Sequence, residues 1–491
     1  MSDNSNSTLN DTAKADAWIR DHRDCVKPRY RLDYHVMPPV GWMNDPNGLV
    51  YFKGQYHAFY QFYPYSSEWG PMHWGHAISD DMVHWKDAPV AMAPGSTADR
   101  DGCYSGSAVD DDGKLSLIYT GQIFDDGDIK PFNTEFSETQ NLAVSEDGIH
   151  FSKYAQNPVI PAAPSDNSRN FRDPKVWKHD GRWYVVIGSS TKDNEARALL
   201  YSSADLREWK FESVIAHSEG KIGEMWECPD FFSLDGKDVL LFSPVGMEPE
   251  GLKYHNVFQT GYLVGDFDYA SGKLQHGEFE EVDRGHDFYA SQTFEAADGR
   301  RICMAWMNMW QTPMPEQADG WAGAMTVPRE LHAVDGQVRM TPIKELESLR
   351  GPVIADVAAP LSNDQVLAAP KENRCEVLFS ADVPADGNSK IGVSLDIGTD
   401  HDVSFTYDAA LGRLTLDRGG EDGVRAYDCG KLEKLDLHIY IDRSSMEVFV
   451  NDGLATFTSR MYPATAATIK AVAPASGLNG KVRVYALNAM R

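Results

Sequence analysis

Three acidic residues stand at nearly the same place in three repeated segments of the chain. Asp45, Asp173 and Glu227 lie eight or nine residues before a glycine that sits between two apolar runs. Two further repeats carry Tyr104 and Ala290 at the matching position. Paired carboxylates hydrolyse glycosidic bonds: one attacks the anomeric carbon as an anion, and another protonates the leaving oxygen. Crowded acids also raise the proton affinity of the least stabilised member. The spacing predicts this chemistry if the fold brings the acids together.

The neighbours of the acids favour a sugar pocket over simple turns. An aspartate before a proline is a common turn opener, so Asp45 or Asp173 alone would carry little information. Aromatic and amide groups stand beside them, however, and such groups pack on sugar rings and bind hydroxyls. A metal site is the weaker alternative, because no EF-hand pattern is present and Arg172 beside Asp173 disfavours a cation. We therefore expect no metal and no cofactor.

The elements that must position these acids repeat five times. An apolar run, a turn glycine and a second apolar run recur with glycine separations of 59, 68, 55 and 63 residues. Between them lies a second pattern of strand, acidic turn and strand, seen at 74–85, 141–151 and 198–209. Four strands in about 60 residues, five times over, predict a five-bladed β-propeller rather than a long irregular sandwich. The first strand of each blade lines the central channel, so the acids are expected to converge there.

The pattern changes after residue 329, which predicts a second domain. The segment 341–353 is expected to form a short helix that ends at Gly351 and Pro352. Apolar residues then alternate with polar ones at 435–441, as in a half-buried strand, which favours an all-β sandwich. The predicted boundaries are 1–30 for a polar N-terminal extension with a disordered lead, 31–340 for the propeller, 341–360 for a linker helix and 361–491 for the sandwich. The sandwich could dock on the propeller, bind carbohydrate or mediate oligomerisation.

Composition excludes several classes of partner. The 491 residues carry a net charge of -27, which repels nucleic acids and anionic membrane surfaces. No apolar run is long enough to span a membrane, and the polar start lacks the apolar segment of a secretory signal. Six scattered cysteines contain no C-x-x-C pair. These features lead us to expect a cytoplasmic protein with reduced thiols and a small-molecule substrate. The oligomeric state stays open.

Eight segments resemble glycoside hydrolase family 32, the invertase or β-fructofuranosidase family. The match is dense over about 31–350 and looser in the C-terminal part. In chain order the segments are WMNDPNG (42–48), QFYP (61–64), HWGHAISDDMVHW (73–85), YSGSA (104–108), FRDPKVW (171–177), WECPDFF (226–232), GHDFYASQTF (285–294) and GWAGAMTVPREL (320–331).

This resemblance implies a fold and a set of roles. It implies a five-bladed propeller joined to a β-sandwich, and hydrolysis of β-fructofuranosides with retention. Asp45 matches the family's nucleophile and Glu227 its acid/base, while Asp173 matches an acid that stabilises the transition state. Tyr104 stands where many relatives have phenylalanine, so a changed contact to the sugar is expected there. The implied pocket residues are Trp42, Asn44, Gln61, Trp69, Tyr104, Ser105, Arg172 and Trp310.

The sequence thus predicts a retaining, exo-acting β-fructofuranosidase for sucrose and short fructo-oligosaccharides that needs no cofactor. Within this class, hydrolysis of sucrose 6-phosphate and net fructosyl transfer stay open. A noncatalytic fructan-binding protein is the alternative from another class, and loss of one of the acids would have favoured it. The acidic run at 125–128 is expected to be a solvated loop near the pocket entrance.

Overall fold

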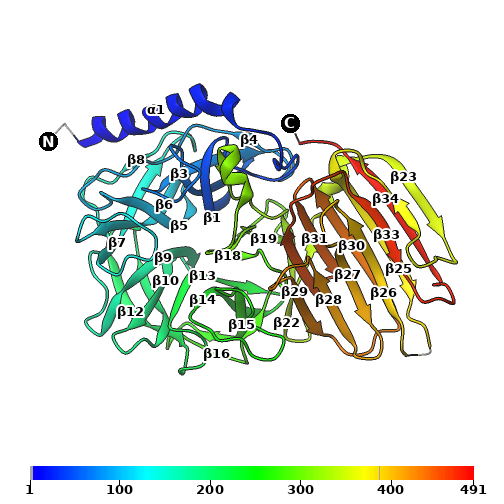
Figure 1. Ribbon diagram of the computed structural model, residues 1–491. Coiled ribbons are helices and arrows are strands. Elements are labelled where there is room, and N and C mark those ends of the chain that lie inside the picture. Colours follow the sequence, from blue (N-terminus) through cyan, green and yellow to red (C-terminus); the bar gives the residue numbers. More distant parts are fainter. Residues whose placement is uncertain (1–3, 386, 491) are drawn as a thin grey trace.

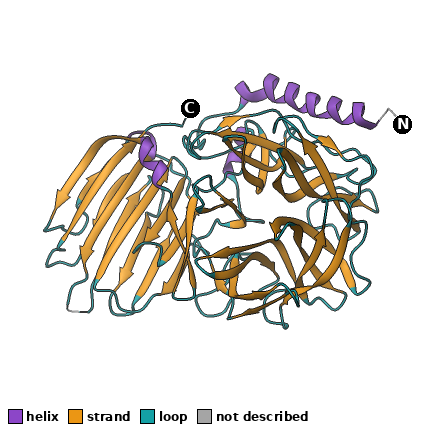
Figure 2. Ribbon diagram, turned by 180° about the vertical axis from the view of Figure 1, so that it is seen from behind, coloured by secondary structure: helices purple, strands orange, loops and turns teal. Residues whose placement is uncertain are grey.

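Five β-sheets form a ring and two more stack beside it, so the molecule has two parts that lie side by side (Figure 1). The computed structural model describes residues 4–385 and 387–490. Strands dominate throughout, and the one long helix lies outside the sheets (Figure 2). The predicted all-β fold, a five-bladed β-propeller followed by a β-sandwich, is confirmed.

Each blade is an antiparallel sheet, and the first strands of neighbouring blades pack on one another around the ring. Blade 1 consists of β1 (Gly41–Phe52), β2 (Gln55–Tyr63), β3 (His73–Ser79) and β4 (Lys86–Asp87). Blade 2 consists of β5 (Gly102–Asp111), β6 (Lys114–Phe124), β7 (Phe136–Ser145) and β8 (Ser152–Lys153). Blade 3 consists of β9 (Asn167–His179), β10 (Arg182–Thr191), β11 (Ala196–Ser203) and β12 (Trp209–His217).

The last two blades follow the same order along the chain. Blade 4 consists of β13 (Met225–Leu234), β14 (Lys237–Val245), β15 (Gly261–Asp268), β16 (Lys273–His276) and β17 (Glu280–Glu281). Blade 5 consists of β18 (Tyr289–Glu295), β19 (Arg301–Trp306), β21 (Arg329–Val334) and β22 (Gln337–Pro342). The short strand β20 (Trp321–Ala322) pairs in parallel with β1, so the last part of the propeller returns to the first blade.

The repeated glycines occupy the tight turns between the first two strands of the blades. Gly54, Gly113, Gly181 and Gly236 have φ values of 90°, 86°, 75° and 82°. The residue before each of these glycines also has positive φ. Two consecutive residues with positive φ are the requirement of a type I′ hairpin turn, which explains the glycine at this position. In blade 5 the turn is longer, and Gly299 alone has positive φ.

The acidic turns of the second pattern have a common structural cause. Asp81, Asp147 and Asp205 each accept hydrogen bonds from the backbone N–H groups two and three residues later, at 2.8–3.0 Å. An aspartate that bonds its own following backbone in this way fixes a turn. These acids are therefore structural.

A β-bulge interrupts the first strand of every blade. An extra residue in a bulge bends the strand and redirects its side chains. Asp45 and Asp173 lie inside their bulges, and Glu227 is the last paired residue before its own. On the first strands, the interruptions fall between Met43 and Pro46, Cys103 and Gly106, Arg172 and Lys175, Glu227 and Asp230, and Tyr289 and Gln292.

The C-terminal part is a sandwich of two six-stranded sheets around a continuous apolar core. In order across the first sheet, the strands are β23 (Arg350–Ala358), β34 (Gly480–Leu487), β25 (Arg374–Asp382), β30 (Lys434–Asp442), β31 (Ser445–Val450) and β32 (Ala455–Arg460). The second sheet contains β24 (Val366–Ala368), β33 (Thr468–Val472), β26 (Lys390–Asp396), β27 (Val403–Asp408), β28 (Arg413–Asp417) and β29 (Val424–Asp428). The alternating apolar residues at 435–441 lie on β30 and are buried in this core.

The predicted linker helix is wrong in extent. The short 3-10 helix η3 (Lys344–Leu349) occupies only part of 341–360, and β23 follows it at once. β23 pairs with β34 along its length, so sandwich structure begins at Arg350 rather than at residue 361. Gly351 and Pro352 stand in an edge strand, where a missing backbone N–H is tolerated. Two more 3-10 turns are η2 (Pro315–Asp319) in the propeller and η4 (Lys371–Asn373) in the sandwich.

The predicted disordered lead is also wrong over the residues that the structure describes. Helix α1 (Asn4–His22), followed by the 3-10 turn η1 (Arg23–Cys25), lies along the propeller (Figure 1). Ala15 is buried, and Asp16 accepts a hydrogen bond from the backbone N–H of Val90 at 3.0 Å. These contacts stabilise a helix that a polar sequence alone does not predict. Residues 1–3 of the predicted extension lie outside the described residues. Among those described, no helix is long and apolar enough to cross a membrane.

Candidate active site

The bulges of the first strands surround a pocket of about 310 Å³. Ten of the eleven predicted site residues line it. These are Asn44, Asp45, Gln61, Trp69, Tyr104, Ser105, Arg172, Asp173, Glu227 and Trp310. Trp42 is the exception, because it is buried behind the wall. Its indole N–H donates to Asn44 Oδ1 at 2.7 Å, so it orients a residue of the pocket.

The three acids meet around one cysteine. Cys228 Sγ lies 3.5 Å from Asp45 Oδ2 and 3.6 Å from Asp173 Oδ2. Its backbone N–H also donates to Asp173 Oδ2 at 2.9 Å, and Glu227 is the preceding residue. Asp45 and Glu227 are 182 residues apart in the sequence. The three acids nevertheless lie together in one small space. This convergence is the arrangement that glycoside hydrolysis requires.

Asp45 is partly buried and held by several donors. Ser105 Oγ donates to its Oδ2 atom at 2.6 Å, and Asn44 Nδ2 donates to its Oδ1 atom at 3.0 Å. Burial raises the pKa of Asp45, and these hydrogen bonds oppose that rise by stabilising the anion. The charge of Glu227 raises the pKa further. The donors fix the direction of the carboxylate, which suits a nucleophile that must attack one carbon.

Asp173 is held in an unusual backbone conformation. Its φ is 64°, and its backbone N–H donates to Thr120 Oγ1 at 2.9 Å. Burial, reinforced by the charges of Glu227 and Asp45, raises the pKa of Asp173 to about 8 although Arg172 opposes the rise. Burial, together with the nearby charges of the other two acids, thus favours a proton on Asp173 near neutral pH.

Glu227 is bound on both carboxylate oxygens. Arg172 donates to Oε1 from Nη2 at 2.8 Å and from Nε at 3.2 Å, and the Tyr289 hydroxyl donates to Oε2. The same guanidinium donates from Nη1 to Asn170 Oδ1 at 2.7 Å and to Glu138 Oε1 at 3.3 Å. Arg172 therefore joins Glu227 to a second acid, Glu138, which is buried.

Aromatic rings form the walls of the pocket. Trp69 lies edge-on to Tyr104, with ring centroids 6.2 Å apart, and Trp310 stacks on Trp42 at 5.7 Å. Such rings offer apolar faces to a sugar. Gln61 Nε2 donates to the backbone carbonyl of Cys103 at 3.0 Å, so this side chain supports the wall as well as lining it.

Several residues that line the pocket or contact its acids escaped prediction from the sequence. Cys228 and Tyr289 adjoin positions that the turn glycines mark, so the same alignment could have found them. Glu138 lies on the third strand of blade 2, outside every motif. Phe132 and Phe258 lie in loops, and no spacing rule points to them. The acidic run at 125–128 is exposed and begins the loop that carries Phe132. This loop lines the pocket entrance, as expected.

No group of three potential metal-ligating His, Cys, Asp or Glu side chains with suitable geometry occurs among the described residues. The absence of a cofactor stays a prediction.

Comparison with known families decides the classification. Residues 35–342 match the glycosyl hydrolases family 32 N-terminal domain, and residues 345–486 match the family 32 C-terminal domain. The chain belongs to glycoside hydrolase family 32. The predicted family and the predicted glycoside hydrolase are therefore confirmed.

Relatives of this family 32 chain include bacterial enzymes that match it over most of their own length. A raffinose invertase of Escherichia coli is 47% identical over 436 residues, which cover 88% of this chain and 89% of the relative. A sucrose-6-phosphate hydrolase of Zymomonas mobilis is 43% identical over 455 residues, covering 88% of this chain and 86% of the relative.

A solved structure also matches the whole family 32 chain. The structure is a variant of a Bombyx mori β-fructofuranosidase in complex with sucrose. It superimposes with a TM-score of 0.88 at 38% identity, over 98% of both chains. Both parts of the present fold are therefore included in the match.

Proposed function

We propose that this chain is a retaining, exo-acting β-fructofuranosidase that hydrolyses sucrose and short fructo-oligosaccharides. The observation that carries the proposal is the meeting of Asp45, Asp173 and Glu227 in one pocket, with Cys228 Sγ within 3.6 Å of two of them. Relatives named as invertases and β-fructofuranosidases support the same substrate class.

In the proposed mechanism Asp45 attacks C2 of the fructosyl group while Glu227 protonates the leaving oxygen. The glycosidic bond breaks, and a fructosyl ester of Asp45 forms. Glu227 then removes a proton from water, which attacks C2 and releases Asp45. Asp173 bonds sugar hydroxyls, and these hydrogen bonds strengthen as positive charge develops on the ring. Two displacements at C2 retain the β configuration.

The shape of the pocket supports exo action on short substrates. The loop at 125–135 lies over the mouth, and its residues from Lys130 to Thr134 belong to the lining. We infer that this loop limits the pocket to the terminal fructosyl group of a chain. Initial rates on sucrose, 1-kestose and inulin test this point. Faster turnover of long inulin with release of internal oligomers would contradict it.

Sucrose 6-phosphate is the second candidate substrate, because several relatives carry the name sucrose-6-phosphate hydrolase. A phosphate needs a cation, and the described lining residues include two. Arg172 is already bound by Glu138 and Glu227, and Lys130 pairs with Asp128 at the surface. The acidic pocket therefore favours the neutral sugar. Rates on sucrose and sucrose 6-phosphate for the wild type and for Lys130→Ala decide between them, because only a phosphate would respond to Lys130.

A reducing compartment such as the cytoplasm fits the six cysteines, all of which have free thiols.

A further inference from the structure

Three rings from three loops meet at the mouth of the pocket. Phe132 comes from the loop after β6, Phe258 from the loop after β14, and Trp310 from the loop after β19. The ring of Phe132 lies 5.5 Å from Trp310 and 6.1 Å from Phe258, measured between centroids. We call these three residues the aromatic platform. Phe132 is 57% exposed, so a large apolar face is open to a ligand.

The platform lies on the side of the pocket where the leaving group departs. The ring of Phe258 packs on Tyr289 at 5.7 Å, and the Tyr289 hydroxyl donates to Glu227. Glu227 is the proposed donor of a proton to the leaving oxygen. A ring next to Tyr289 is therefore close to the sugar that this oxygen carries away.

The sandwich reaches the loop of Phe258 through Arg425. This β29 residue donates from Nε to Asn256 Oδ1 at 2.9 Å and from Nη2 to the backbone carbonyl of His255 at 3.1 Å. Asp422 accepts two further hydrogen bonds from the same guanidinium at 2.8 Å. Arg425 is only 6% exposed, so its geometry is fixed by the contact between the two domains.

Asn256 passes this restraint on to the rest of the loop. Its Nδ2 atom donates to the backbone carbonyl of Gly285 at 2.9 Å, and its own carbonyl accepts from Gln259 Nε2 at 2.6 Å. Phe258 lies between Asn256 and Gln259 in the sequence. Both sides of the ring-bearing residue are thus tied to the propeller, and the first is also tied to the sandwich.

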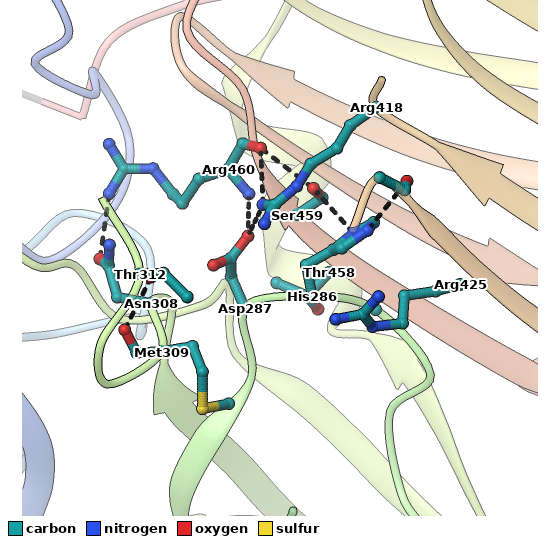
Figure 3. A network of polar contacts seen from close by, with 12 residues as sticks. His286, Asp287, Asn308, Met309, Thr312, Arg418, Arg425, Thr458, Ser459 and Arg460 are labelled. Carbon is teal, nitrogen blue, oxygen red and sulfur yellow. Dashed lines mark hydrogen bonds and ion pairs between the residues drawn. The ribbon is translucent and has the colours of Figure 1, made fainter. Parts of the chain in front are cut away.

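A second arginine of the sandwich contacts the loop that carries Trp310. Arg460, at the end of β32, donates from Nη1 to Asn308 Oδ1 at 3.1 Å and pairs with Glu316 at 3.0 Å. Asn308 and Glu316 stand on either side of Trp310 in the chain. Figure 3 shows Arg418, Arg425 and Arg460 of the sandwich beside the propeller loops, with Arg460 bonded to Asn308.

We propose that the C-terminal sandwich is part of the active site because Arg425 and Arg460 are positioning residues for the aromatic platform. In this proposal Phe132, Phe258 and Trp310 bind the apolar face of the leaving-group hexose. The two arginines hold the loops of Phe258 and Trp310 at the spacing that this sugar requires. The proposal rests on the proposed β-fructofuranosidase function and assigns the sandwich a role in it.

Two substrates that differ only in the leaving group test the proposal. Sucrose releases glucose, whereas methyl β-D-fructofuranoside releases methanol and cannot contact the platform. Phe258→Ala and Arg425→Ala should each lower kcat/KM on sucrose about fivefold, mostly through KM, because an aromatic contact of this kind is worth about 1 kcal/mol. Both should lower kcat/KM on methyl fructoside much less than on sucrose. Arg413→Ala is the control, since the Arg413 guanidinium is bonded to Asp428, within the sandwich, among the described residues.

The double variant Arg425→Ala/Phe258→Ala shows whether the arginine acts through the ring. It should be no worse on sucrose than Phe258→Ala alone, and Arg425→Lys should recover part of the loss. Equal losses on both substrates, or additive losses in the double variant, would overturn the proposal. If Arg425→Ala does not fold, Asn256→Ala removes the same hydrogen bond from the propeller side. The results expected for Arg425→Ala, and those that would overturn the proposal, then apply to Asn256→Ala. A wild type that cleaves neither substrate would instead refute the proposed function.

Discussion

Arg172 and Glu227 occupy equivalent places on the first strands of neighbouring blades, with Arg172 Nη2 2.8 Å from Glu227 Oε1. Arg172 pairs with Gly188 and Glu227 with Ser243, in each case as the last residue before the bulge. Asp173 lies one residue further, inside the bulge. The offset gives the acids different surroundings, and we expect their substitution to have different consequences.

Replacing Glu227 by alanine should lower the rate most for substrates with poor leaving groups. Sucrose departs as a sugar alkoxide and needs a proton, whereas a fructoside with an acidic phenol does not. Glu227→Ala should therefore lose about 10²–10⁴-fold more rate on sucrose than on the activated fructoside. The space left beside the fructosyl ester should also admit azide and yield fructosyl azide. Steady-state kcat/KM on both substrates, with and without azide, measures this difference.

Replacing Asp173 by alanine should lower the rate on both substrates together. Asp173 is proposed to bond sugar hydroxyls in the transition state, and that contact does not depend on the leaving group. Azide should give no recovery. The same rate measurements serve here. If Asp173→Ala showed the leaving-group dependence and Glu227→Ala did not, the two roles would be reversed.

Asp45→Asn should abolish hydrolysis and leave the fold intact. The amide is nearly isosteric but a poor nucleophile, so a loss of at least about 10³-fold, or roughly 4 kcal/mol of transition-state stabilisation, is expected. NMR of the wild-type reaction should show β-fructofuranose before mutarotation. Circular dichroism of the variant is the control for folding. An initial α product would contradict double displacement.

The acidic limb of the pH profile should respond to Ser105. Burial raises the pKa of Asp45, and the hydrogen bond from Ser105 Oγ lowers it. A nucleophile must be ionised, so kcat/KM falls as the pH drops through this pKa. Ser105→Ala removes the stabilising donor and should shift the acidic limb to higher pH. Ser107→Ala should not, because the Ser107 hydroxyl donates to the backbone carbonyl of Pro174. If the acidic limb of the pH profile did not shift in Ser105→Ala, that limb would not report the ionisation of Asp45.

The repeated part of the fold could be predicted because its signals are local. Gly54 marks a hairpin because it and its neighbour Lys53 have positive φ, and Asp81 fixes its turn through neighbouring N–H groups. Helix α1 and strand β23 depend on contacts with distant segments, such as Asp16 with the N–H of Val90. Tertiary contacts of this kind leave no pattern in a polar helix or an edge strand.

The acids could be predicted because each is placed by its own strand, but their partners could not. Glu138 reaches Arg172 from the third strand of another blade, and Phe132 reaches the pocket from a loop. Spacing along the chain contains no information on which strand edge faces which loop. The sequence also suggested one shared register, whereas Asp173 lies at the position of Cys228 rather than Glu227.

A buried charged network joins the two domains. His35 Nδ1 lies 2.8 Å from Asp442 Oδ2, and Nε2 lies 2.9 Å from Glu447 Oε1. Arg329 also pairs with Glu447 and with Asp283, which ties the propeller to β31 of the sandwich. Burial lowers the pKa of His35, but its hydrogen bonds and the charges of the two acids outweigh this effect and raise it to about 9.

The protonated His35 should therefore stabilise the fold below about pH 6.5 and lose this effect as the pH rises through about 9. The sign follows because the folded pKa exceeds the ordinary value of 6.5, so the folded state binds the proton more tightly. His35→Gln leaves the buried Asp442 without its paired imidazolium and leaves Glu447 with Arg329 alone, so the free energy of unfolding should fall by about 3–5 kcal/mol near pH 6. The gap to wild type should narrow near pH 10. Denaturant unfolding at both pH values measures this difference in the free energy of unfolding. The control is His84→Gln, because His84 forms an exposed pair with Asp81. That substitution should change the free energy of unfolding by less than about 1 kcal/mol. A gap that stays constant with pH would show that His35 is not charged in the folded protein.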